Sequence, residues 1–263
     1  MKKQLTNLRA WLWPALGMSG LVVLVLLVLT AVSNRKREEI RDVLIDIAEV
    51  KSQQASLDKQ SFDDLLRKSF GITFTGRPLG EIDIRRVEAV LEQDPFVKAA
   101  EVWVDTRYDL HILLYPREPV LRIMDGKGQD YYLDIEGNRI PKSKKFWART
   151  LVATGDIPPH VPDFKERKNY LLKDLYELTL DILNDPYMAG LTEQIHLQNG
   201  EFVLYPKVGN QKIYLGKYEQ IEDKFERLKR FYEKVLPVKG LERYKSIDLR
   251  FDGQVVCKKG NGK

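Results

Sequence analysis

The residues whose spacing comes nearest to a catalytic motif are Ser56 and Lys59. They fit the pattern S-x-x-K, which supplies the serine nucleophile in one class of acyl-transferring enzymes. Enzymes of that class also carry S-D-N and K-T-G motifs, and this sequence contains neither. A pattern with only two fixed positions matches often by accident, so we interpret this tetrapeptide as part of a polar neck.

No other pattern of reactive side chains points to catalysis. The histidines His111, His160 and His196 are isolated, and none has a neighbour at metal-ligand spacing. The sequence contains no H-E-x-x-H, G-x-S-x-G or Walker A motif. Asp83 and Asp163 each precede a helical pattern, and we interpret them as helix N-caps rather than as catalytic acids. We therefore predict a protein that is not an enzyme and that binds no cofactor or metal.

The balance of charges argues against a nucleic-acid partner. The chain carries 43 Lys and Arg residues and 38 Asp and Glu residues, which gives a formal net charge of +5. Lys2, Lys3 and Arg9 supply part of this excess in a stretch without acidic residues, and the rest of the chain is nearly neutral. A nucleic-acid binder concentrates basic side chains on its folded part. The single Cys257 excludes an internal disulfide and does not identify a compartment.

The stretch from Trp11 to Val32 predicts a transmembrane helix. No charged residue occurs between Arg9 and Arg35. A helix of this length is about 33 Å long, enough to cross a hydrocarbon layer of roughly 30 Å. The alternative is a signal peptide cleaved near Ser33, but the apolar core of such peptides runs only about 7–15 residues. We therefore predict a retained membrane anchor.

Basic residues flank this predicted helix equally on both sides, so charge alone does not fix its orientation. The short, acid-free tail of residues 1–10 is typical of an N-terminus that stays in the cytoplasm. That orientation would place the bulk of the chain outside the cytoplasmic membrane.

The region after the anchor predicts a small α+β domain. Its elements are a strand at 43–50, helices at 61–71 and 83–95, and strands at 97–105 and 108–116. Ser61 is the predicted N-cap of the first helix and Gly71 its stop, and Asp83 caps the second. The strand at 43–50 alternates poorly, so its boundary is open. The short loop between the last two strands predicts an antiparallel hairpin.

The remaining region predicts a second module, mostly antiparallel sheet with helices on one side. A two-residue turn at Asn199 and Gly200 predicts a type I′ hairpin. This turn sets two apolar pairs on one face, Leu197 with Phe202 and Ile195 with Leu204. Amphipathic helices are predicted at 163–185 and 218–237, the second ending at Pro237.

Four blocks of the sequence together carry a family resemblance. They are "VEAVLEQDPFVKAAEVWVDTRYDLHILLYPREPVLRI", "YYLDIEGNRIP", "LGKYEQIEDKFERLKRFYEKVLP" and "SIDLRFDG". In this order, behind one predicted transmembrane helix, they make the chain resemble the bacterial cell-division family FtsQ/DivIB over roughly residues 11 to 258. The chain departs from many relatives at "DTRYDL", where a Trp-Pro pair is common, but this turn lies between the same two strands.

The resemblance implies an α+β fold with a POTRA domain, followed by an antiparallel β domain with flanking helices. It also implies a non-enzymatic divisome scaffold that links early and late septal proteins, chiefly through FtsB-like and FtsL-like proteins. The implied organisation is a cytoplasmic tail at 1–10, a transmembrane helix at 11–32, a neck and POTRA domain at 33–123, a β domain at 124–258 and a disordered tail at 259–263. Two other classes stay open: a POTRA-containing factor for protein transport across the envelope, and a membrane-anchored cell-wall enzyme.

The run "SIDLRFDGQVVCKK" predicts two strands around an Asp-Gly turn, and the second of them would form a sheet edge. In proteins of this family the last strand pairs with a short strand of FtsB, so the resemblance implies a partner site at this edge. The predicted partner-binding residues are Arg227, Arg230, Asp248, Leu249, Arg250, Phe251, Gln254, Val255, Val256 and Cys257.

Two registers are open for these two strands. A two-residue loop at Asp252 and Gly253 would pair Leu249 with Val256, whereas a three-residue loop would pair Leu249 with Cys257. Because Pro lacks a backbone N–H, Val256→Pro is predicted to remove partner binding with little loss of stability. Three of the side chains are predicted to belong to the core: Leu249, Phe251 and Val255.

Overall fold

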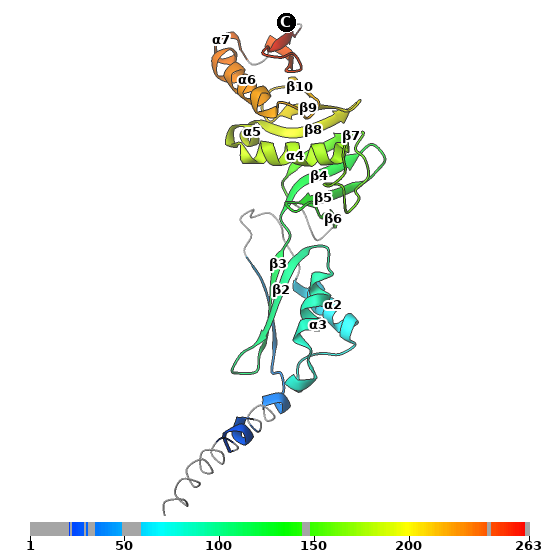
Figure 1. Cartoon of the computed structure of the whole chain (residues 1–263), viewed down its shortest axis with the longest axis vertical. Helices are drawn as coiled ribbons and strands as arrows, with labels where there is room; N and C mark the ends of the chain where they lie inside the picture. Colours follow the sequence, from blue (N-terminus) through cyan, green and yellow to red (C-terminus); the bar gives the residue numbers. More distant parts are fainter. Residues whose placement is uncertain are drawn as a thin grey trace, which may run out of the picture. The chain divides into compact units, whose positions relative to one another are not determined.

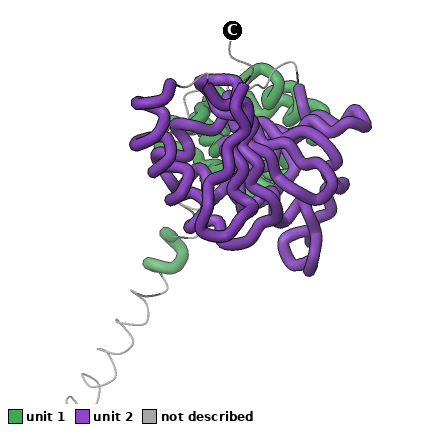
Figure 2. Tube along the Cα trace, turned by 90° about the horizontal axis from the view of Figure 1, so that it is seen from above, with its two compact units in different colours: residues 1–48, 58–115 green, residues 49–57, 116–263 purple. Residues whose placement is uncertain are grey.

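The computed structural model describes residues 21, 23–28, 30, 35–48, 59–143, 148–240 and 243–260. The chain divides into two compact units, residues 1–48 with 58–115 and residues 49–57 with 116–263 (Figure 2). The division between them therefore lies earlier than the predicted boundary after residue 123. A boundary at 123 would cut through strand β4, which spans Pro119–Asp125.

Most of the predicted transmembrane helix and the whole of the predicted cytoplasmic tail lie outside the described residues. Where the segment is described, at residues 21, 23–28 and 30, its residues are helical and their side chains are exposed. Among the described residues, no helix has both the length and the apolar character needed to cross a membrane.

The first unit has the predicted order of strand, helix, helix, strand, strand (Figure 1). Its elements are β1 (Val43–Ile47), α2 (Lys59–Phe70), the short 3-10 turn η1 (Leu79–Glu81), α3 (Ile84–Glu92), β2 (Val97–Val104) and β3 (Leu110–Pro116). The sheet order is β1-β3-β2, and β1 runs parallel to β3. The loop between β2 and β3 is too short for a parallel crossover, so this pair is antiparallel as predicted.

The helix ends of the first unit test the capping predictions. The Asp83 side chain accepts a hydrogen bond from the Arg86 N–H at 3.1 Å, which confirms Asp83 as the N-cap of α3. Gly71 has a φ of +66° and follows α2 directly, so it ends that helix as predicted. The prediction for Ser61 is wrong, because α2 already begins at Lys59.

The second unit is built on one nine-stranded sheet with the order β12-β11-β10-β9-β8-β7-β4-β5-β6 (Figure 1). The strands other than β4 are β5 (Asp130–Asp134), β6 (Arg139–Pro141), β7 (Leu151–Gly155), β8 (Thr192–Gln198), β9 (Glu201–Pro206), β10 (Lys212–Gly216), β11 (Tyr244–Asp248) and β12 (Val256–Lys259). The helices are α4 (Leu171–Asn184), α5 (Pro186–Leu191), α6 (Ile221–Lys234) and α7 (Leu236–Lys239).

This sheet is mixed rather than antiparallel. The pairs β4–β7, β7–β8 and β10–β11 are parallel, and the other five pairs are antiparallel. The prediction of a mostly antiparallel sheet is therefore confirmed, whereas the three parallel pairs correct the wholly antiparallel β domain that the resemblance implies. For the pairs β7–β8 and β10–β11 the reason is that α4 with α5 connects β7 to β8, and α6 with α7 connects β10 to β11. A crossover helix returns the chain to the same end of the sheet, so the next strand must run parallel. Both crossovers leave parallel strands and move toward β12, so right-handed connections place both helices on one face.

The core of the second unit lies between these helices and that face of the sheet. It includes buried residues of α4 and α6 and one residue in two from the central strands. The predicted Asn199-Gly200 hairpin is confirmed, because Leu197 pairs with Phe202 and Ile195 with Leu204. Both turn residues have positive φ, +52° and +76°, as a type I′ turn requires.

Two predicted helix boundaries in this unit are wrong. Asp163 does not cap a helix, because the residues after it form turns and α4 begins only at Leu171. Asn169 has a left-handed φ of +55°, which interrupts any helix that began at Asp163. Pro237 does not end the second helix: α6 stops at Lys234, and Pro237 lies in the first turn of α7, where its missing N–H costs nothing.

Candidate partner-binding edge

The predicted partner site centres on β12, which is the terminal strand of the nine-stranded sheet. Within the described part of the chain, β12 pairs only with β11, in antiparallel fashion. One side of β12 therefore carries backbone N–H and C=O groups that no neighbouring strand takes up. Such a row of unpaired groups is the part of a sheet to which another strand can add.

The register of β11 and β12 differs from both predicted registers. Asp248 lies opposite Val256 and Ile247 opposite Cys257, so Leu249 has no partner in β12. The chain leaves the ladder after Asp248 and forms a longer loop through residues 249–255 before β12 begins. The Asp-Gly turn is thus the tip of a loop rather than a tight hairpin.

One hydrogen bond beyond the strand establishes which backbone groups of β12 face outward. The Gly260 N–H donates to the carbonyl oxygen of Arg243, just before β11, at 2.9 Å. Backbone groups in a strand point alternately to its two sides, so those of Val256 also face β11. Those of Cys257 and Lys259 face away from the sheet. The extra residue of the β-bulge lies on β11, so the alternation along β12 is uninterrupted.

A second hydrogen bond, on the other side of β11, agrees with this assignment. The Leu249 N–H donates to the carbonyl oxygen of Tyr214 in β10 at 2.9 Å. By the same alternation, the backbone groups of Ile247 face β10 and those of Asp248 face β12. Val256 lies opposite Asp248, so its N–H belongs to the internal ladder. The predicted effect of Val256→Pro therefore needs correction, because this change would break the β11–β12 pairing itself.

The side chains of β12 divide between the two faces of the sheet. Cys257 lies opposite the buried Ile247 and packs against the core, and this burial raises the pKa of its thiol. Val256 is on the other face and is 43% exposed. Phe251, in the loop, is 51% exposed, so the prediction that it belongs to the core is wrong. These two apolar side chains are accessible beside the free edge.

Arg227 of α6 holds the loop that precedes β12. Its guanidinium donates to three carbonyl oxygens of that loop, those of Leu249 at 3.2 Å, Phe251 at 2.9 Å and Gln254. Its Nε also donates to Asp223, one helical turn earlier, at 2.8 Å. Only 9% of Arg227 is exposed, so its charge is used inside the unit rather than offered to a partner. Arg227, which was predicted as a partner-binding residue, therefore supports the loop from inside the unit.

Arg250 is fixed in a similar way on the outer side of the loop. It donates to both carboxylate oxygens of Asp248, at 2.9 and 2.6 Å, and to Glu201 of β9 at 2.9 Å. Burial opposes ionisation of Asp248, but its hydrogen bonds from Arg250 prevail and lower the pKa of this carboxyl. Gly216 makes room for Arg250, because a Cβ there would lie 2.8 Å from the Arg250 Cγ.

The other predicted site residues occupy different environments. Leu249 is fully buried and Val255 packs against the core, as predicted for both side chains. Arg230 and Gln254 are exposed. Glu201 and Gly216, which position Arg250, were not among the predicted site residues. A glycine after an alternating strand was the available signal for Gly216, whereas nothing in the sequence marks Glu201.

The residues singled out for chemistry do not gather into one site. His111 stacks on Trp103 with the ring centroids 5.1 Å apart, His160 contacts the Gly137 carbonyl, and His196 contacts Thr154. Ser56 lies outside the described residues. Lys59 forms an ion pair with Asp46 at 2.9 Å.

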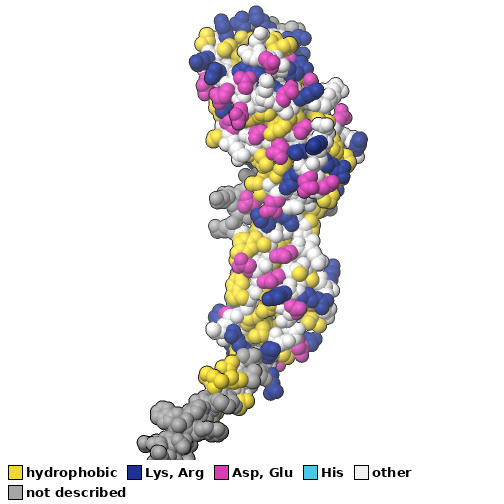
Figure 3. Space-filling view, in the orientation of Figure 1, with side chains coloured by type: hydrophobic (Ala, Val, Ile, Leu, Met, Phe, Trp, Pro, Cys, Tyr) yellow, Lys and Arg dark blue, Asp and Glu magenta, His cyan; other side chains and the backbone are white. Residues whose placement is uncertain are grey.

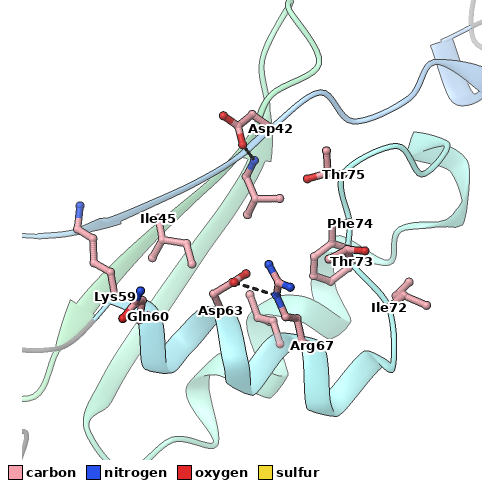
Figure 4. Close-up of a pocket in the computed structure, with 12 residues that line it drawn as sticks. Asp42, Ile45, Lys59, Gln60, Asp63, Arg67, Ile72, Thr73, Phe74 and Thr75 are labelled. Atoms are coloured by element: carbon pink, nitrogen blue, oxygen red, sulfur yellow. Dashed lines mark hydrogen bonds and ion pairs between the residues drawn. The ribbon is translucent and has the colours of Figure 1, made fainter.

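A pocket of the first unit lies between β1, α2 and the loop after α2 (Figure 4). Its acidic and basic side chains bind one another, because Asp63 pairs with Arg67 at 2.9 Å. Asp42 accepts a hydrogen bond from the Val43 N–H at 2.8 Å. On the face shown in Figure 3, Lys and Arg side chains are interspersed with Asp and Glu rather than gathered in one basic patch.

Comparisons with known proteins agree with the two units of the fold. A family model described as a POTRA-like domain matches residues 39–115. A second model, described as FtsQ/DivIB, C-terminal related, matches residues 118–258. A curated relative, "Cell division protein FtsQ" of Rhodothermus marinus, is 29% identical over 189 residues, which cover 70% of this chain and 68% of that protein. The second family model spans more than half of the sequence, and the chain therefore belongs to the FtsQ/DivIB C-terminal related family.

Proposed function

We propose that this chain is a non-enzymatic cell-division scaffold that binds FtsB-like and FtsL-like proteins by strand addition at β12. Membership of the FtsQ/DivIB family supports the role in division. A relative that carries the name of a cell division protein supports it as well. β12 is a terminal strand of its sheet, which suits this binding mode.

The observation that carries the proposal is the outward direction of the Cys257 and Lys259 backbone groups at the end of the sheet. An extended partner segment beside β12 would pair with these N–H and C=O groups and continue the ladder. Neither amide donates to a side chain within the described residues. The free edge is therefore ready for a partner without any prior rearrangement.

The side chains around this edge indicate what kind of strand would fit. Val256 and Phe251 offer exposed apolar surface. Lys258, Lys259 and Arg230 are exposed and basic. A partner strand with apolar residues at alternate positions and acidic residues nearby would match both features, because opposite charges across an interface favour encounter and register.

We further propose that residues 11–32 anchor the chain in the cytoplasmic membrane, with residues 1–10 in the cytoplasm and both compact units outside. The uncharged stretch between Arg9 and Arg35 supports this arrangement. The anchor would tether both compact units on the side of the membrane where the outer segments of other single-pass division proteins lie.

Depletion of the protein in its native host tests the role in division. Depleted cells should grow as filaments without completed septa, and the intact gene supplied in trans should restore septation. A gene that lacks residues 256–259 should fail to restore it while the protein still accumulates. Normal septation after depletion would contradict the proposed function.

A further inference from the structure

The first unit has a free sheet edge of its own, at β2, and this edge is occupied by side chains. β2 is a terminal strand in the order β1-β3-β2. The Val102 N–H donates to Glu88 Oε1 at 3.0 Å, and the Ala100 N–H donates to Glu92 Oε1 at 3.3 Å. Both acceptors belong to α3, so these two amides point away from β3 and toward the helix.

The spacing of the two glutamates matches the spacing of the two amides. Glu88 and Glu92 are four residues apart, which is about 6 Å along a helix axis. Ala100 and Val102 are two residues apart, which is about 6.6 Å along a strand. Glu88 meets the later amide and Glu92 the earlier one, so α3 runs antiparallel to β2. One carboxylate per helical turn therefore meets each outward amide in this part of β2.

We propose that Glu88 and Glu92 close the free edge of β2 against strand addition. An added strand needs the N–H groups of Ala100 and Val102, and both are already bound to carboxylate oxygens. A carbonyl oxygen of an incoming strand would also approach these negatively charged oxygens, which repels it. The contact thus removes β2 from the sheet edges to which a strand could add, whereas β12 keeps its outward amides free of side-chain acceptors within the described residues.

The contrast with β12 supports this inference. The outward amides of β12, those of Cys257 and Lys259, have no side-chain acceptor within the described residues, whereas two outward amides of β2 have one each. Edge strands of soluble domains invite unwanted pairing unless charge or a covering element prevents it. In the first unit, α3 supplies both the cover and the charge. The inference does not depend on the proposed role in division.

Amide hydrogen exchange at residue resolution tests the closed edge in the full chain, purified in detergent micelles. In the unmodified chain, the Ala100 and Val102 amides should be protected although β2 is terminal. Glu88→Ala should speed exchange at Val102 at least tenfold and leave Ala100 unchanged, and Glu92→Ala should do the reverse. Unprotected Ala100 and Val102 amides in the unmodified chain would overturn the proposal. This measurement does not depend on whether any variant folds.

Self-association tests the consequence of opening the edge. The double variant E88A/E92A should associate with a second copy in a concentration-dependent way, measured by sedimentation equilibrium. The matched variant E88Q/E92Q keeps an acceptor oxygen at the same reach, so it should sediment like the unmodified chain. Equal sedimentation of E88A/E92A and E88Q/E92Q would contradict closure by these side chains. If E88A/E92A does not fold, the amide exchange rates of the two single variants test whether the glutamates close the edge.

Discussion

Arg227 Nη1 donates a hydrogen bond to the Phe251 carbonyl oxygen at 2.9 Å, which joins α6 to the loop before β12. The same guanidinium also reaches the Leu249 and Gln254 carbonyls. Helix α6 therefore determines where β12 begins, although the two elements lie far apart in sequence. A residue that was expected to contact a partner instead holds the surface that the partner would use.

Arg227→Met should destabilise the second unit by about 1–3 kcal/mol, because it leaves buried carbonyl oxygens without donors while keeping an apolar stem. It should also weaken binding of an FtsB-like partner, since the loop would no longer hold β12 in place. Thermal unfolding and a binding titration measure the two effects. Arg230→Met, an exposed change on the same helix, is the control and should leave the melting temperature within a degree or two. An Arg227→Met variant that melts and binds like the unmodified chain would count against this support.

Proline substitutions along β12 should separate the free edge from the internal ladder. Cys257→Pro removes an N–H that faces away from the sheet, so it should abolish partner binding with a modest loss of stability. Val256→Pro removes an N–H that faces β11 and should lower the melting temperature more. Co-purification with an FtsB-like protein, together with melting curves, distinguishes the two. Full partner binding by Cys257→Pro would show that strand addition does not occur there.

Gly155→Ala should destabilise the second unit by several kcal/mol. Gly155 has a φ of +102°, and a Cβ there would lie 2.0 Å from the Leu197 carbonyl oxygen in the neighbouring strand. Gly190→Ala is the matched control, because Gly190 lies in α5 with no atom within 4 Å of an added Cβ. That change should stabilise the unit by about 0.5–1 kcal/mol. Chemical denaturation of both variants measures the difference, and equal stabilities would refute the steric argument.

Protonation of Asp130 should lower the stability of the second unit at acidic pH. The Arg122 guanidinium binds both Asp130 oxygens, at 2.9 and 2.8 Å, and Lys142 adds a further bond. These bonds, that of Arg122 first, hold the pKa of Asp130 at about 2, below its ordinary 3.8. A carboxyl with a lowered pKa in the folded state stabilises the fold above its unfolded pKa, and this contribution is lost as the pH falls toward the folded pKa.

The pH window follows from these two values. The difference in melting temperature between the unmodified chain and Asp130→Asn should be constant above about pH 5 and shrink between about pH 4 and 2. Asp252→Asn, an exposed change in the loop before β12, serves as the control for the loss of one carboxylate. A difference for Asp130→Asn that stays constant down to pH 2 would exclude the proposed contribution of its ion pairs.

Local patterns predicted the elements whose structure depends on neighbouring residues. The Asn199-Gly200 turn fixed the register of β8 and β9, because its left-handed backbone allows only one tight pairing of the flanking strands. Asp83 could be recognised as a cap from its position before the helix. The order of strands and helices in the first unit follows for the same reason.

Relationships between distant segments could not be read from the sequence. The register of β11 and β12 depends on Arg227, which draws the loop carbonyls toward α6. The parallel pairs β7–β8 and β10–β11 follow from the paths of the crossover helices, and periodicity alone does not reveal them. Glu88 and Glu92 determine which amides of β2 are hydrogen-bonded. Their spacing in the sequence does not predict this role, because the role requires that α3 lie along β2.

The β-bulge of β11 at Tyr244–Ser246 limits the length over which a neighbouring chain can form strand pairing at this end of the sheet. A bulge increases the local twist, so a long, flat stack of identical strands would lose contact after a few residues. Lys258 and Lys259 add like-charge repulsion between copies. The extra twist and the like charges together disfavour amyloid-like growth at this end of the sheet.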